Sequence, residues 1–347
     1  MQSPFDFLLG IFSLDIGIDL GTANTLIYVH DKGVVLREPS VVAVDENTNL
    51  VRWVGEEARA MIGRTPQGIR AIRPLKDGVV ADLEYAKIML KKFVERVTGS
   101  GGIKNPDMAI GVPSGVTSVE RIAIKSVAEN ARANLIYLPE EPMAAAIGAS
   151  LPVVEPTGSM IVDIGGGTTE VAVISLSGIV VNESIRIAGD ELNDSIIFYL
   201  KKVHSLAIGD RTAEEIKFRL GSAFKTKDND KIDVRGLSLL NGMPRTITIS
   251  RGEVREAMQE PLWSIVEAVK RTLERTPPEL AADIFNRGIV LTGGGALLQG
   301  LDELISSETE VPVFVADDPL SSVAIGTGKM LTDPTYRRVL EQCMCHK

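Results

Sequence analysis

One strand-turn-strand pattern occurs twice in this chain and limits the possible folds more than any other feature. Residues 19–25 read Asp-Leu-Gly-Thr-Ala-Asn-Thr, and residues 163–169 read Asp-Ile-Gly-Gly-Gly-Thr-Thr. Each copy follows a short apolar run and leads into a second one, at 26–29 and at 171–174. In each copy we therefore expect a buried strand that ends at an aspartate, a turn through glycine and hydroxyl residues, and a second strand.

Both turns have the chemistry of an anion-binding hairpin. Glycine lets backbone N–H groups approach phosphate oxygens, and threonine hydroxyl groups add further donors. An aspartate at the end of the strand can hold a hydrated magnesium ion. Two such hairpins facing each other would hold a nucleoside triphosphate from both sides. A GxxxxGK[ST] loop is absent from the sequence, so the chain is not a P-loop enzyme.

The repetition extends beyond the hairpins. After each hairpin the sequence predicts a strand that ends in a glycine turn, then a helix, a strand and another helix. The first series lies at 108–115, 119–133, 135–138 and 141–149, and the second at 288–295, 297–305, 311–315 and 318–328. The last helix of each series is expected to open with an acidic residue followed by proline, at Glu141-Pro142 and at Asp318-Pro319.

A mixed sheet with helices on both faces accounts for this order in each half. We predict an α/β chain of two duplicated domains, residues 1–150 completed by helices at about 319–347, and residues 151–318. Each domain carries an insert subdomain, at about 33–66 and at about 190–252. After the second insert, Ser250 is expected to cap a helix that runs through 253–276 and that Pro277-Pro278 ends. The glycine turns lie at strand ends, where open α/β sheets bind ligands. The expected nucleotide cleft therefore lies between the two domains.

Composition narrows the class of partner. A chain of 347 residues with 44% hydrophobic and 24% charged residues is typical of a soluble globular protein of two domains. The net charge of −9, without a dense basic cluster, argues against nucleic acid as a partner. Cys343 and Cys345 are the only cysteines, so a reducing cytoplasm is the expected location. With His346 they could ligate a metal ion, but three soft ligands in a terminal tail make a weak site.

The N-terminal segment, residues 3–14, has an unusual pattern. Its polar or small residues recur at helical spacing, and large apolar residues occupy the rest of its surface. It lacks the positive residue that begins a signal peptide, and no apolar stretch in the chain reaches the ~18 residues needed to span a bilayer. One interpretation is a short helix in the membrane interface, and the other is a segment that packs on the protein's own core. In the first interpretation the membrane contacts are Phe5, Leu8, Leu9 and Phe12.

Six stretches together resemble the actin-like ATPase superfamily, and within it the MreB family of bacterial actins. They span nearly the whole chain and lie at 18–26, 37–43, 73–79, 141–148, 163–171 and 291–297. The resemblance implies two actin/RNase H-like domains built on mixed five-stranded sheets, with ATP and Mg²⁺ bound between them.

The resemblance also implies roles for individual residues. Asp19 and Asp163 would hold Mg²⁺ through water, and Glu141 and Thr168 match the residues that orient the attacking water. Asp163 completes this expected catalytic set. Glu141 by itself could also be a simple helix cap, because it precedes a proline at a helix start. The expected nucleotide contacts, from the phosphate turns to the adenosine side, are Asp19, Gly21, Thr22, Ala23, Asn24, Gly165, Gly166, Gly167, Thr168, Glu214, Glu215, Ile216, Lys217, Gly294, Gly295, Ala296 and Leu297.

The resemblance further implies a cytoskeletal ATPase. Slow hydrolysis would accompany head-to-tail assembly of the chain with itself into filaments. The filaments would lie on the inner face of the cytoplasmic membrane, contact membrane proteins of cell-wall synthesis and help to set rod shape. A small-metabolite kinase of the same fold is the alternative. A chaperone-type ATPase would need a β-rich substrate domain, for which the residues after 328 leave no room.

Overall fold

The computed structural model describes residues 15–65, 67–99, 105–225 and 230–345. The predicted membrane residues Phe5, Leu8, Leu9 and Phe12 lie outside this part of the chain, as does His346. Across the described ranges, no helix has both the length and the apolar character needed to cross a bilayer.

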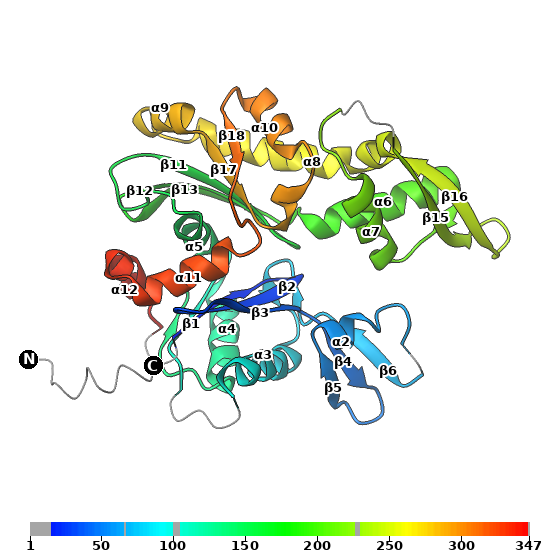
Figure 1. Cartoon of the computed structure of the whole chain (residues 1–347), viewed down its shortest axis with the longest axis horizontal. Helices are drawn as coiled ribbons and strands as arrows, with labels where there is room; N and C mark the ends of the chain where they lie inside the picture. The colour runs from blue at the N-terminus through cyan, green and yellow to red at the C-terminus, as the bar shows by residue number, and fades with distance from the viewer. Residues whose placement is uncertain (1–14, 66, 100–104, 226–229, 346–347) are drawn as a thin grey trace, which may run out of the picture. The chain divides into compact units, whose positions relative to one another are not determined.

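The described residues form two compact units (Figure 1). The first unit runs to Thr157 and also contains Ile174–Ile179 and the chain from Leu320 onward. The second unit contains Gly158–Val173 and Val180–Pro319.

Each unit is built on its own five-stranded sheet, and the two sheets have the same topology. The strands are β1 (Ile16–Leu20), β2 (Asn24–Val29), β3 (Gly33–Pro39), β9 (Met108–Ile110) and β10 (Ile136–Tyr137) in the first unit, and β11 (Ser159–Ile164), β12 (Thr169–Ser175), β13 (Gly178–Ile185), β17 (Ile289–Thr292) and β18 (Val313–Val315) in the second. The strand order is β3-β2-β1-β9-β10 in the first sheet and β13-β12-β11-β17-β18 in the second. In the first sheet β1, β2 and β3 pair antiparallel, whereas β9 and β10 continue it in parallel. Since β17 and β18 also run parallel to β11, the predicted pair of mixed five-stranded sheets is confirmed.

Alternation along β1 decides which helices cover each face of the first sheet. Ile16 and Ile18 join the apolar core that contains residues of α3 (Leu83–Thr98) and α4 (Ser118–Asn130). Gly17 faces the other way, toward α11 (Ser322–Thr332), where an added Cβ would lie 2.3 Å from the backbone nitrogen of Gly328. Helix α5 (Glu141–Gly148) packs against α11. The sheet is therefore covered on both faces, as the sequence pattern predicts.

The helices of the second unit build the larger core. They are α6 (Gly189–His204), α7 (Asp210–Leu220), α8 (Arg251–Glu274), α9 (Pro278–Arg287), the 3₁₀ helix η1 (Gly294–Leu297) and α10 (Leu301–Thr309). Apolar residues of β11 on one face, such as Val162, pack with residues of α6 and α8, such as Ile196 and Ile265. The capping box formed by Ser250 and Glu253 starts α8 where the sequence predicts a helix cap.

Two expected helix boundaries are wrong, and one helix is missed. Pro277-Pro278 does not only end a helix, because Pro278 also begins α9, where a missing N–H is tolerated. The helix expected at 297–305 is divided into η1 and α10, since Gly300 adopts a positive φ of 74° between them. The helix expected from Asp318 begins at Ser322, because the Pro319 carbonyl accepts hydrogen bonds from Gly293 N (2.8 Å) and Thr292 Oγ1 (3.0 Å).

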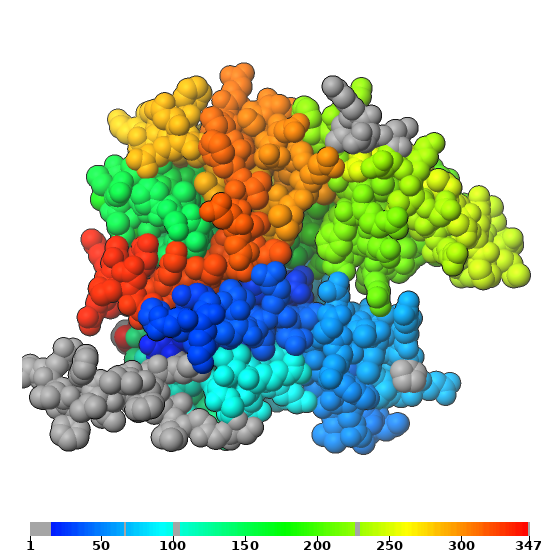
Figure 2. All heavy atoms as spheres, viewed as in Figure 1, coloured from blue at the N-terminus to red at the C-terminus, as the bar shows by residue number. Residues whose placement is uncertain are grey.

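Each unit also carries a small three-stranded sheet. The first unit has β4 (Val42–Asp45), β5 (Val51–Val54) and β6 (Ile69–Ile72) in the order β5-β4-β6, with α2 (Glu56–Arg59) beside them. The second has β14 (Leu206–Ala207), β15 (Lys231–Ser238) and β16 (Pro244–Ser250) in that order. The β15–β16 hairpin lies at the surface (yellow-green in Figure 2) and exposes Leu240 and Met243 near its tip. Because β3 pairs with β2 in the main sheet, the first small sheet begins later than the start expected for the first insert.

Short elements complete the first unit. They are the hairpin strands β7 (Leu75–Lys76) and β8 (Val79–Val80), the 3₁₀ helix η2 (Pro334–Tyr336) and α12 (Arg337–Gln342). Beyond α12 the chain runs beside β10, where Leu138 N donates to Cys343 O (2.9 Å) and Cys345 N to Ile136 O (2.9 Å).

Candidate functional site

The turn between β1 and β2 is held from one side by Ser40. The Ser40 hydroxyl donates to Gly21 O (2.6 Å), and its backbone N–H donates to Ala23 O (3.0 Å). A carbonyl and the next N–H lie in one peptide plane and point in opposite directions. The N–H groups of Thr22 and Asn24 therefore point away from Ser40. At Gly21 a Cβ would lie 2.8 Å from Asn24 O, so the tight turn needs glycine.

Thr22 is supported by a second turn of the same unit. Its Oγ1 accepts a hydrogen bond from Gly78 N (2.9 Å), and Asp77 and Gly78 both have positive φ between β7 and β8. The hydroxyl hydrogen of Thr22 is thus left to donate to another acceptor. The Asp77-Gly78 pair is a turn signal in the sequence, but only the structure shows that this turn reaches Thr22.

Asp19 and Glu141 both lie beside the segment that follows β9, Asp19 in β1 and Glu141 at the start of α5. Asp19 lies near the end of β1, and Gly111 N, just after β9, donates to Ile18 O (3.0 Å). Glu141 is the first residue of α5 and is 8% exposed, and its N–H donates to Val112 O (2.7 Å). A Cβ on Gly111 would lie 3.2 Å from Glu141 Cγ, so glycine leaves the space that this side chain occupies.

The turn between β11 and β12 also has two carbonyl groups bonded to a neighbouring segment, here the start of α6. The Gly165 carbonyl accepts from Gly189 N (3.2 Å), and the Gly166 carbonyl accepts from Asp190 N (2.8 Å). By the same peptide geometry, the N–H groups of Gly166 and Gly167 point away from α6. Gly165 N donates to Thr168 O (2.9 Å), which closes the turn.

Asp163, at the end of β11, is buried with 7% of its surface exposed. Burial raises the pKa of its carboxyl to about 7, because desolvation disfavours the charged form. At Gly293, which has a φ of 78°, a Cβ would lie 2.5 Å from Asp163 Oδ1. Glycine thus keeps the space beside this carboxylate open. A cation in this position would favour the ionised form.

The expected adenosine-side residues divide between α7 and η1. On α7, Ile216 is buried in the core and Glu215 is exposed beside Arg219, while Lys217 Nζ donates to Gly189 O (2.7 Å). The side chain of Ile216 is therefore turned away from any ligand at the surface. On η1, Ala296 is buried and Leu297 is exposed. Sequence reasoning does not identify Gly189, although the structure joins it to both Gly165 and Lys217.

The C-terminal cysteines lie in a setting that disfavours metal binding. Burial raises the pKa of the Cys343 thiol to about 11 and also raises that of Cys345, so both thiols are held in the protonated form. Among the described side chains, no group of three or more His, Cys, Asp and Glu residues could hold a metal ion.

The family comparison covers nearly the whole chain. A family model described as "MreB/Mbl protein" matches residues 13–338. The cell shape-determining protein Mbl of Bacillus subtilis (strain 168) is 53% identical over 321 residues, which is 92% of this chain and 96% of that protein. The cell shape-determining protein MreB of Escherichia coli (strain K12) is 53% identical over 327 residues, which is 93% of this chain and 94% of that protein.

Solved structures give the same result. MreB5 of Spiroplasma citri bound to ADP matches with a TM-score of 0.89 and 39% identity, over 94% of this chain and 98% of that one. The structure of the same protein bound to AMPPNP also matches with a TM-score of 0.89. The MamK double helical filament matches in fold, with a TM-score of 0.80 at 21% identity, over 92% of this chain and 99% of that one. By family model, sequence identity and the actin-like fold, the chain belongs to the MreB/Mbl family.

Proposed function

We propose that the chain binds one Mg·ATP with both phosphate hairpins and hydrolyses it slowly. One observation carries this proposal: the β1–β2 and β11–β12 turns occupy corresponding places in two duplicated sheets, and each directs backbone N–H groups away from its supports. Solved structures of a relative at 39% identity are bound to ADP and to AMPPNP, which supports a nucleotide as the ligand.

The turns suit the phosphates for an electrostatic reason. Each turn provides backbone donors that cost little reorganisation, because the opposite carbonyls are already bonded inside the protein. Thr22 and Thr168 add hydroxyl donors beside them. Lys217 and residues 294–297 would contact the adenosine side.

Magnesium fits the carboxylate found at the end of β11. Asp163 is buried, its pKa is raised by desolvation, and Gly293 leaves space beside it. Asp163 and Asp19 would hold the ion through water. When bound, the ion would neutralise part of the phosphate charge.

Hydrolysis needs few protein groups, since phosphoryl transfer depends mostly on positioning and charge neutralisation. We assign Glu141 and Thr168 to the attacking water. The carboxylate of Glu141 would accept a hydrogen bond from that water, and the hydroxyl of Thr168 would fix its direction. The packing of Glu141 against Gly111 would keep the carboxylate in place.

At the cellular level we propose a cytoskeletal role. The curated relatives, about half identical in sequence, are named as cell shape-determining proteins. In this proposal the chain polymerises head to tail and binds the inner face of the cytoplasmic membrane through Phe5, Leu8, Leu9 and Phe12. There the filaments would organise membrane proteins of cell-wall synthesis.

The test combines phosphate release with electron microscopy of the purified protein, with and without lipid vesicles. We expect ATP-dependent filaments, and slow phosphate release that rises with filament mass. Deletion of residues 1–13 should remove vesicle binding and leave the filaments. Rapid phosphorylation of a small hydroxylated metabolite, without filaments, would instead support a kinase.

A further inference from the structure

Two elements that would border the adenosine, α7 and η1, meet at one place in the second unit. Just after α7, Ala223 N donates to Gln299 O (2.8 Å), and Ser222 forms a parallel bridge with the same residue. The approach is close, because a Cβ on Gly221 would lie 2.8 Å from Leu298 Cδ1. The position of Gln299 therefore fixes how the end of α7 lies relative to η1.

The side chain of Gln299 is held by Arg251, the first residue of α8. Arg251 Nη1 donates to Gln299 Oε1 (2.8 Å), and Nη2 donates to Asp230 Oδ2 (2.7 Å). The backbone N–H of Arg251 also donates to Asp230 O (2.9 Å). Arg251 is only 8% exposed. The hydrogen bond to Gln299 is thus a part-buried, charge-assisted contact, which is stronger than a neutral one.

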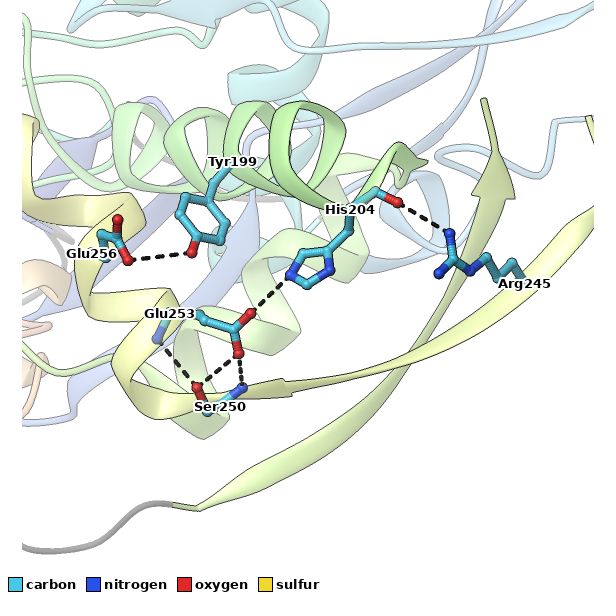
Figure 3. A network of polar contacts seen from close by, with 6 residues as sticks. All are labelled: Tyr199, His204, Arg245, Ser250, Glu253 and Glu256. Carbon is cyan, nitrogen blue, oxygen red and sulfur yellow. Dashed lines mark hydrogen bonds and ion pairs between the residues drawn. The ribbon is translucent and has the colours of Figure 1, made fainter. Parts of the chain in front are cut away.

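The start of α8, where Arg251 lies, is itself held by the Ser250 cap and by contacts with α6 (Figure 3). Glu253 Oε2 accepts from Ser250 N (2.9 Å), and Ser250 caps the helix. The other carboxylate oxygen of Glu253 contacts His204 Nε2 (2.8 Å) at the end of α6. Tyr199 of α6 donates to Glu256 of α8 at 3.3 Å. These contacts attach the first turns of α8 to α6 and aim Arg251 at Gln299.

Burial of the Arg251 side chain carries a desolvation cost, so packing alone does not explain why an arginine lies here. Its Nε is buried, and within the described residues it has no hydrogen-bond partner. An unpaired buried donor is unfavourable, and an apolar side chain of similar length would avoid this cost. The contribution of Arg251 therefore lies in what its two terminal nitrogens hold.

We propose that Arg251 is a positioning residue for the adenosine side of the nucleotide site. It acts through Gln299, which joins the end of α7 to the segment that follows η1, and it does not touch the ligand itself. This inference rests on the proposed nucleotide binding. The phosphate turn has its own supports, since Thr169 Oγ1 donates to Ile187 O (2.7 Å) and Gly189 N to Gly165 O (3.2 Å). Removal of Arg251 should therefore affect adenosine binding more than phosphate binding.

The test measures calorimetric affinities of Arg251→Met for ATP, ADP and inorganic tripolyphosphate. We expect ATP and ADP to bind about tenfold more weakly, the loss typical of one charge-assisted hydrogen bond, and tripolyphosphate to change less than about twofold. The matched control is Arg271→Met on the same helix, which removes the ion pair with Glu183 far from Gln299. The control should leave all three affinities unchanged.

A second variant protects the test against misfolding. Gln299→Leu should give the same loss for ATP, and the double variant should lose no more than either single one, because both remove one contact. Equal losses for ATP and tripolyphosphate, an effect of Arg271→Met as large as that of Arg251→Met, or unchanged ATP affinity in Gln299→Leu would overturn the inference. Absence of ATP binding in the unaltered protein would instead contradict the proposed function.

Discussion

The two hairpins that we propose bind phosphate both direct backbone N–H groups away from their supports, but the supports differ. The first turn is supported by the hydroxyl and the backbone N–H of Ser40 and by the loop that contains Gly78. The second turn is held by hydrogen bonds from the backbone N–H groups of Gly189 and Asp190 at the start of α6. A hydroxyl contact disappears with one substitution, whereas a backbone contact remains when side chains change. The comparison suggests that the first hairpin is the more easily perturbed of the two.

The aspartates of the two hairpins differ in burial. Asp163 is buried and desolvation raises its pKa to about 7, whereas Asp19 is only partly buried. Without a cation, the charge on Asp163 is costly to the folded protein. The second hairpin therefore combines a turn held by backbone contacts with a buried carboxylate. The first combines a turn held partly by a hydroxyl group with a carboxylate that is better solvated.

The largest expected effect concerns hydrolysis. Glu141→Ala should lower the rate of phosphate release at saturating ATP by about 10²-fold or more, because it removes the carboxylate that we propose orients the attacking water. The affinity for ATP should stay within about twofold, since this interaction matters mainly in the transition state. The matched control is Glu140→Gln, which changes the preceding carboxylate, bonded to Ser114. Unchanged phosphate release in Glu141→Ala would remove Glu141 from the mechanism.

The second-largest expected effect is on Mg·ATP binding, and it allows the two aspartates to be compared. Asp19→Asn and Asp163→Asn should each weaken Mg·ATP binding by about 10- to 100-fold, the range for groups that act on a metal ion through its outer shell. Only Asp163→Asn should raise the melting temperature of the nucleotide-free protein at pH 8, because only it removes a buried charge. Calorimetry and thermal unfolding measure the two quantities. Equal melting temperatures for both variants would contradict the difference in burial.

The pH dependence of stability also tests the burial of Asp163. The folded-state pKa of Asp163 is about 7, above the ordinary value of 3.8, so between these values the folded protein binds more protons than the unfolded chain. The contribution of Asp163 to stability should therefore be largest below pH 4 and fall as pH rises toward 7, by about 1.4 kcal/mol per pH unit at most. The measurement is the difference in unfolding free energy between the unaltered protein and Asp163→Asn without nucleotide. A difference that is constant from pH 4 to pH 7 would contradict this pKa.

The smallest effect tests the supports of the turns. Ser40→Ala should weaken ATP binding by about fivefold, because it removes the hydroxyl contacts with Gly21 and Thr25. Thr169→Val should weaken it by less than about twofold, since the backbone contacts of the second turn with α6 remain. Equal losses in a calorimetric titration would show that the two turns are supported alike.

The sequence predicts much of this fold, because its strongest signals are local. The repeated hairpins and the strand-helix series reveal the two sheets, and Ser250 marks the start of α8. Helix boundaries fail where a distant group competes, as when Pro319 O bonds with Thr292 and Gly293. Helix α9 is missed because two prolines indicate an end more clearly than a beginning.

The candidate site is predicted less completely, because its supports are long-range contacts. Ser40 meets Gly21, Gly78 meets Thr22 and Lys217 meets Gly189 only after folding. The burial of Ile216 could have been inferred from its apolar character on an amphipathic helix. The contact between Arg251 and Gln299 leaves no pattern in the sequence at all.

Calorimetric stoichiometry tests the central claim most directly, namely that both hairpins bind the same nucleotide. The unaltered protein should bind one Mg·ATP per chain, and Gly21→Val and Gly165→Val should each abolish binding alone while the fold remains intact by circular dichroism. Two nucleotides per chain, or one bound with undiminished affinity after either substitution, would contradict the account.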